Sequence, residues 1–130
     1  MFFFLHISFM IIFTLSIVAG VGVAMFFRRK KNWMMIHKSL NSLGMLGLST
    51  GLVLAFLYVA SSGNKHMNGF HQVAGLVAFA LALMTLLLGF YQFKASNKSS
   101  ARTAHRWAGR VSVLMFLMTM ILGLVLINII

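Results

Sequence analysis

The sequence contains no cysteine, no aspartate, no glutamate and no proline. Without cysteine it cannot form disulfides, thiolate zinc sites, iron–sulfur clusters or a covalent c-type haem attachment, all of which require thiols. Without carboxylates it lacks the groups that ion pumps and proton-coupled carriers usually place in the bilayer, and the oxygen ligands that hard metal ions prefer. Without proline, no residue is present that would break a long helix. These absences disfavour ion pumps and carboxylate metal sites, and they favour straight helices.

Apolar side chains are what the chain has in abundance. Of its 130 residues 61% are hydrophobic, and the mean hydropathy is +0.97, which fits a small integral membrane protein better than a soluble domain. Four hydrophobic segments, at roughly 2–27, 33–60, 67–93 and 102–130, are each long enough to cross about 30 Å of hydrocarbon. None alternates apolar and polar residues as a transmembrane β-strand would. The sequence therefore predicts an all-α, integral membrane four-helix bundle of up-down-up-down topology, with residues 1–130 in a single domain.

The basic residues predict the orientation of these helices. The formal net charge is +11, and Lys65 is the one basic residue in the second linker. The others lie at or beside the first and third linkers: Arg28, Arg29, Lys30, Lys31, Lys38, Lys94, Lys98, Arg102, Arg106 and Arg110. By the positive-inside rule, both termini are expected outside. Because the charges flank spans of bilayer length, the expected partner is a lipid bilayer and no nucleic acid. The first segment lacks the basic start and the cleavage site of a signal peptide, so we expect it to be retained.

Four histidines lie at matching depths in the predicted spans. His6 and His71 lie near the outer ends of the first and third segments, whereas His37 and His105 lie near the inner ends of the second and fourth. Imidazoles are costly to bury in hydrocarbon, so two such layers suggest shared ligands. If the helices follow one another around a ring, each pair faces across the bundle axis and can bind one haem iron. We predict two non-covalent haem b groups, with the layers about 17 or 18 residues of helix, or roughly 25 Å, apart.

Several cations near these histidines are candidates for binding haem propionates or an anionic substrate. Lys38 and Arg106 directly follow the inner histidines, and Arg110 lies one turn beyond. The positive-inside rule and attraction to anionic lipids would also account for inner cations. Neither applies to Lys65 on the outer side, so it is the stronger candidate for a site residue.

Two glycines share a spacing with two of the histidines. His71 precedes Gly75, and His105 precedes Gly109, by one helical turn. A glycine at this position leaves room on the histidine's face of the helix, where the edge of a haem could lie. Close helix packing through small residues is the alternative interpretation of these and the other glycines within the spans.

Three histidine-bearing runs, at 33–41, 70–75 and 104–110, resemble the helix starts of the cytochrome b561 family, especially its bacterial and cytochrome-domain branches. The likeness extends from His6 to Gly123. It implies that the chain moves electrons across a membrane between two b haems, with His6 paired with His71 and His37 paired with His105 as ligands. Only the four core helices are expected, and no extracellular domain precedes them, so ascorbate is not the expected donor.

Some alternatives stay open at this point. His66 lies five residues before His71, on a different helical face, and any of the 11 methionines could replace a histidine as an axial ligand. The chain could also be the membrane-anchor cytochrome b subunit of a quinone-linked complex, or a non-redox four-helix membrane protein. We predict electron transfer with no residue catalytic in its own right, which leaves oxidoreductase activity open. The predicted redox partners are a quinone, a metal chelate or a periplasmic redox protein. The expected location is a prokaryotic inner membrane. The chain is expected to act alone, as a homodimer or within a complex.

Overall fold

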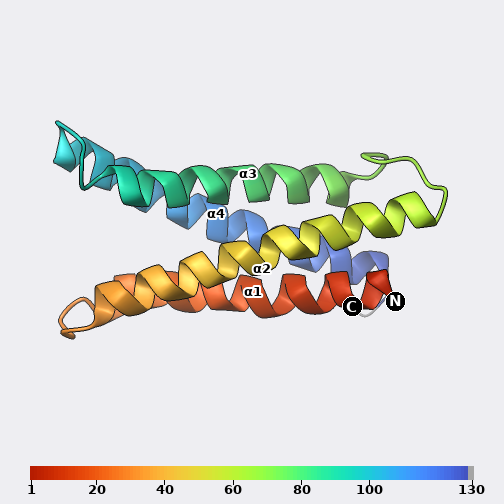
Figure 1. Cartoon of the computed structure of the whole chain (residues 1–130), viewed down its shortest axis with the longest axis horizontal. Helices are drawn as coiled ribbons and strands as arrows, with labels where there is room; N and C mark the ends of the chain where they lie inside the picture. The colour runs from red at the N-terminus through yellow and green to blue at the C-terminus, as the bar shows by residue number, and fades with distance from the viewer. Residues whose placement is uncertain (129–130) are drawn as a thin grey trace. The chain divides into compact units, whose positions relative to one another are not determined.

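A computed structural model describes residues 1–128, which fold into four α-helices (Figure 1). These are α1 (Phe2–Phe26), α2 (Trp33–Ser61), α3 (Phe70–Tyr91) and α4 (Lys98–Leu126). No strand occurs in this described part of the chain. Each helix is long and apolar enough to cross a membrane. The predicted fold class is confirmed, and the protein is a multi-pass integral membrane protein.

The third and fourth helices begin at different residues from those predicted. Helix α3 begins at Phe70, after Met67, whose backbone has a φ of 59° and therefore cannot continue a right-handed helix. Helix α4 begins at Lys98, because the side-chain oxygen of Asn97 accepts a hydrogen bond from the backbone N–H of Ser100 at 3.0 Å. Hydropathy gave no indication of this polar first turn. The end of the fourth predicted segment, at 129–130, lies outside the described residues.

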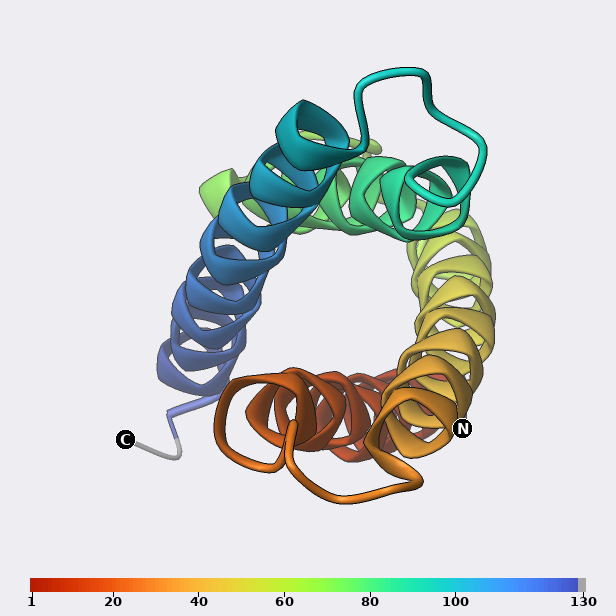
Figure 2. The same ribbon diagram turned by 90° about the vertical axis from the view of Figure 1, so that its left-hand side faces the viewer.

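The chain divides into two compact units, Met1–Val73 and the residues from Ala74 onward. In the first unit α1 and α2 lie side by side as a hairpin. In the second unit α4 lies beside the part of α3 from Ala74 onward, as the contacts of Thr85 with His105 and Ser112 show (Figure 2). The predicted single domain and closed bundle concern how these units combine, so both stay predictions.

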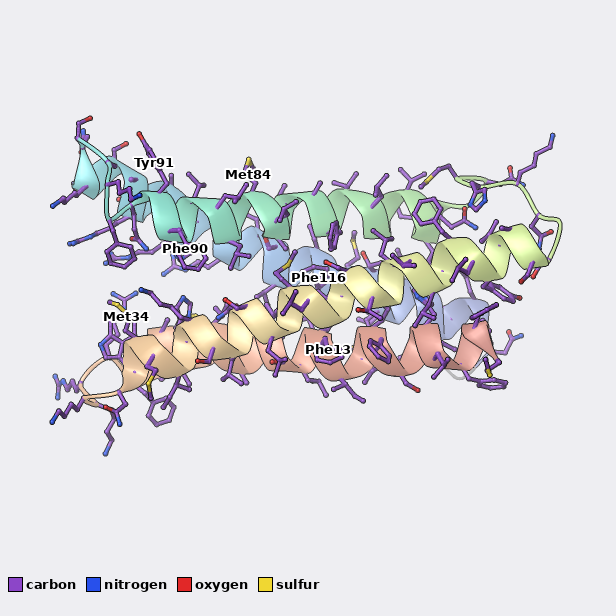
Figure 3. All side chains as sticks on the ribbon, viewed as in Figure 1. Phe13, Met34, Met84, Phe90, Tyr91 and Phe116 are labelled. Carbon is purple, nitrogen blue, oxygen red and sulfur yellow. The ribbon has the colours of Figure 1, made fainter. Side chains whose placement is uncertain are left out.

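Glycines on α2 allow close packing within the first hairpin. Gly47 lies against the ring of Phe13, labelled in Figure 3, and a Cβ on this glycine would overlap the ring. A Cβ on Gly44 would lie 2.5 Å from Cγ1 of Ile17. Both glycines are buried. The interpretation of such glycines as packing residues therefore holds for this hairpin.

In the second hairpin, the buried alanines lie on α3. The buried positions of α3 include Ala78 and Ala82, whereas α4 contributes Phe116, which is only 2% exposed and is labelled in Figure 3. Met84 on α3 is 51% exposed, and its side chain points away from the ribbon (Figure 3). An apolar outer surface of this kind is what a helix facing hydrocarbon requires.

Candidate cofactor site

The four predicted ligand histidines all lie within helices and are all half-buried. His6 lies in the first turns of α1 and His71 in the first turn of α3, while His37 and His105 lie near the starts of α2 and α4. No long loop has to be ordered to position them, because each ring is held by a rigid helix.

In the first hairpin, the two histidines make reciprocal hydrogen bonds. Nδ1 of His6 on α1 lies 2.8 Å from the carbonyl oxygen of Gly51 on α2, and Nδ1 of His37 on α2 lies 2.8 Å from the carbonyl oxygen of Gly20 on α1. A carbonyl oxygen can only accept, so each Nδ1 donates its hydrogen. In the neutral ring, the lone pair is then on Nε2, the nitrogen that can bind a metal.

The same bonds fix the distance between the two imidazole levels of this hairpin. On α1, His6 and Gly20 are ~14 residues apart, which is roughly 21 Å at about 1.5 Å per residue. On α2, His37 and Gly51 have the same spacing and give the same rise. The separation is somewhat shorter than the roughly 25 Å expected from the linkers, because distances counted from linkers ignore how far each helix extends beyond its neighbour.

His105 is held in the same manner within the second hairpin. Its Nδ1 lies 2.9 Å from the carbonyl oxygen of Thr85 on α3, so this ring also has its lone pair on Nε2. Its Cε1 would lie 3.0 Å from a Cβ added to Gly89. The Thr85 hydroxyl donates to the carbonyl of Leu81 at 2.8 Å and lies 3.2 Å from the hydroxyl of Ser112. The face of α3 beside this imidazole is therefore closely packed and polar.

Asn41 is a neighbour of His37 that the sequence analysis did not single out. Its Nδ2 donates to the backbone carbonyl of His37 at 2.7 Å and lies 3.2 Å from Nδ1 of the same residue. An amide one turn after a histidine in an apolar helix was a signal that could have identified it. The accepting carbonyls of Gly20, Gly51 and Thr85 had no such signal, since every residue carries a carbonyl.

The two glycines predicted as haem-edge residues face the neighbouring helix of their own hairpin. A Cβ on Gly75 would lie 3.5 Å from Cγ2 of Thr119, and one on Gly109 would lie 3.6 Å from Cγ2 of Thr85. Both are ordinary van der Waals distances, so both glycines take part in packing α3 against α4. Their role beside a haem stays a prediction.

The predicted cationic residues are all exposed. Lys38 directly follows His37 within α2, and Arg106 directly follows His105 within α4. Arg110 lies near the middle of α4, where its guanidinium is 5.1 Å from the ring centroid of Trp107. Lys65 is exposed in the linker between α2 and α3.

The neighbouring His66 is also exposed, and its ring stacks on Phe56 with the centroids 5.2 Å apart. Its ring therefore lies beside α2, which favours His71 over His66 as an axial ligand.

These residues fit a b-type haem by the chemistry of their donor atoms. Three imidazoles have Nδ1 bonded to a backbone carbonyl, the outer hydrogen bond that orients metal-binding histidines and raises their basicity. A ferric haem brings its own carboxylates, and this sequence provides cations and no acids to meet them.

The chain matches the family model described as eukaryotic cytochrome b561 over residues 2–129. No curated protein and no solved structure matches it. The family predicted from the histidine-bearing runs is confirmed, while the bacterial branch stays a prediction. Because the match extends over nearly the whole chain, the protein belongs to the cytochrome b561 family.

Proposed function

We propose that the protein is a di-haem b-type cytochrome that transfers electrons across its membrane between an outer and an inner bis-histidine haem. Membership of the family implies transmembrane electron transfer by haem. The two-layer proposal is supported by the reciprocal bonds of His6 with Gly51 and of His37 with Gly20, which hold two imidazoles at different levels in one hairpin.

The proposed ligand pairs are His6 with His71 for the outer haem and His37 with His105 for the inner haem. When bound, haem b supplies a one-electron Fe(III)/Fe(II) couple. The protein's own contribution is to hold each imidazole in the tautomer that presents Nε2 and to surround it with apolar helix. The two imidazole levels of the first hairpin are roughly 21 Å apart along the helices, so the residues would hold two haems at separate, fixed positions between which an electron would pass.

The proposed propionate partners are the inner cations Lys38, Arg106 and Arg110, with Lys65 serving the outer haem. All four are exposed, and no acidic side chain competes for them. Gly75 and Gly109 are proposed to leave room for the haem edges.

The charge distribution supports a topology with both termini outside. The proposed location is a prokaryotic inner membrane. A small molecule such as a quinone or a metal chelate, or a periplasmic redox protein, would exchange electrons with each haem. The protein would act alone, as a homodimer or as a subunit of a larger complex. No side chain is proposed to perform chemistry on a substrate, so any oxidoreductase activity would be that of the bound haems.

The test is a haem count on the purified protein. We expect two haems per chain by the pyridine haemochrome method, and His37→Ala or His105→Ala should each remove about half of the Soret absorbance. His66→Ala is the matched control, because this exposed histidine stacks on Phe56 and should leave both haems in place. A wild-type protein without haem would refute the proposal, and a single variant that loses all absorbance or none would refute the two-layer assignment.

A further inference from the structure

The two hairpins repeat one pattern of burial. If α1 is aligned with α3 at His6 and His71, and α2 with α4 at His37 and His105, each buried residue of α4 coincides with a buried residue of α2. The matched buried pairs are Gly44 with Ser112, Leu48 with Phe116, and Gly51 with Thr119. On the other two helices the matched buried pairs are Ile17 with Ala82 and Gly20 with Thr85. Helices with little sequence identity therefore bury equivalent faces.

The contacts repeat as well as the burial. His37 bonds to the carbonyl of Gly20, and its counterpart His105 bonds to the carbonyl of Thr85, the residue aligned with Gly20. Asn41 lies against Gly20, and its counterpart Gly109 lies against Thr85. The inner histidine of each hairpin is thus held at the same point on the neighbouring helix.

Within these matched contacts, the large and small residues are exchanged. The first hairpin has Gly20 facing Asn41, whereas the second has Thr85 facing Gly109. The same exchange occurs further along the helices, where Met10 lies against Gly51 in the first hairpin and Gly75 lies against Thr119 in the second. At both contacts a larger residue on one helix faces a glycine on the other, so the interface stays filled, as close packing requires.

We propose that Asn41 is a positioning residue for His37, that Gly20 is small in order to admit it, and that the Gly20–Asn41 pair is the exchanged counterpart of the Thr85–Gly109 pair. In the first hairpin this pair places the amide of Asn41 on α2 beside the inner imidazole. The part of this proposal that concerns haem rests on the proposed function, whereas the exchanged packing does not.

The geometry gives Asn41 an electrostatic role as well as a steric one. Its amide nitrogen donates to the His37 carbonyl at 2.7 Å, so the positive end of the amide dipole lies beside the imidazole edge, 3.2 Å from Nδ1. Nδ1 already donates to Gly20, so this contact brings two donors together. Positive potential at a ligand disfavours the more highly charged oxidised iron. Asn41 should therefore raise the reduction potential of the inner haem.

The first experiment is a redox titration of the haem-loaded protein with Asn41→Ala and Asn41→Ser. Both should lower the midpoint potential of the inner haem and leave that of the outer haem unchanged. Serine can still bond to the backbone one turn back but brings no amide near the ring, so a merely structural role would leave Asn41→Ser at the wild-type potential. Ser49→Ala is the matched control, since Ser49 bonds to the carbonyl of Met45 on the same helix at 2.8 Å. An unchanged or raised potential in Asn41→Ser would overturn the electrostatic role, whatever Asn41→Ala does.

The second experiment converts the first hairpin to the arrangement of the second. Gly20→Thr alone should lower the melting temperature in detergent, because its Cβ would overlap the amide of Asn41 and would lie 3.1 Å from Cβ of Leu40. The double variant Gly20→Thr/Asn41→Gly should recover most of that loss. Gly22→Thr controls for a β-branched residue in the helix, because a Cβ on Gly22 meets no atom within 4 Å.

The two failures can be told apart. A double variant no more stable than Gly20→Thr would overturn the exchanged packing, whether or not haem is bound. A wild-type protein that binds no haem would instead refute the proposed function and, with it, only the redox part of this inference.

Discussion

Substitution of Gly89 by alanine should weaken haem binding at the inner site alone. A Cβ at this position would lie 3.0 Å from Cε1 of His105, whereas carbon atoms in contact are about 3.5 to 4.0 Å apart. The imidazole would have to move by roughly 0.5 to 1 Å away from α3. That movement would lengthen its 2.9 Å bond to the Thr85 carbonyl beyond the usual limit of about 3.2 Å.

The size of the effect follows from two costs. The weakened hydrogen bond is worth about 1 kcal/mol, and an added methyl group in a packed site costs about 1 to 3 kcal/mol when the ring is held in its native position. Part of the second cost is relieved by movement of the ring, so we expect a net loss of about 2 kcal/mol. That loss corresponds to about a 30-fold weaker affinity for the inner haem.

The assay is titration of haem into apoprotein in detergent, followed by the Soret band, with a redox titration to identify the haem that is lost. Gly22→Ala is the matched control, because it is the same substitution at a helical glycine with open space around it. If Gly89→Ala binds both haems as tightly as Gly22→Ala, then His105 is not held against α3 in the loaded protein and the reasoning fails.

Three further predictions concern packing, topology and proton movement. Gly47→Ala should lower the free energy of unfolding by about 1 to 3 kcal/mol, because its Cβ overlaps Phe13. Gly22→Ala should be neutral or stabilising by up to about 1 kcal/mol, since a Cβ there meets no atom within 4 Å. Thermal unfolding in detergent measures both variants, and equal melting temperatures would contradict the packing argument. The chain has no cysteine, so a single introduced thiol reports on one side of the membrane. Lys65→Cys should react with a membrane-impermeant thiol reagent in intact cells, whereas Ser99→Cys should react only after lysis. The reverse pattern would show that the termini face inward. Because no carboxylate is present to relay protons, electron transfer in proteoliposomes should take up no protons beyond those of the donor and acceptor chemistry, and a larger uptake measured with a pH dye would show pumping.

The sequence determined the class of the protein through composition and spacing. Helix length in a bilayer is fixed by the thickness of the hydrocarbon, so hydrophobic runs of sufficient length sufficed to predict four spans. The helix starts were harder to predict. Asn97 caps α4 through a side-chain hydrogen bond, and Met67 lies before α3 with a positive φ, and neither feature changes the hydropathy of the segment.

The candidate ligands were also predictable, because a histidine in an apolar span is rare and costly. The sequence alone did not distinguish glycines that pack helices from glycines that border a histidine. Gly47 and Gly89 are both glycines in apolar helices, yet one faces the ring of Phe13 and the other the ring of His105.

Only the tertiary structure decided how each imidazole is held. His6, His37 and His105 bond to backbone carbonyls on the neighbouring helix, and a carbonyl is present at every position of the chain. Which carbonyl lies within reach depends on the register between two packed helices, and that register is set by the fit of large side chains such as Phe13 into small positions such as Gly47. Residue types determined which side chains could bind a cofactor. The packing of the helices determined the tautomer of these three imidazoles and the level at which each lies along its hairpin.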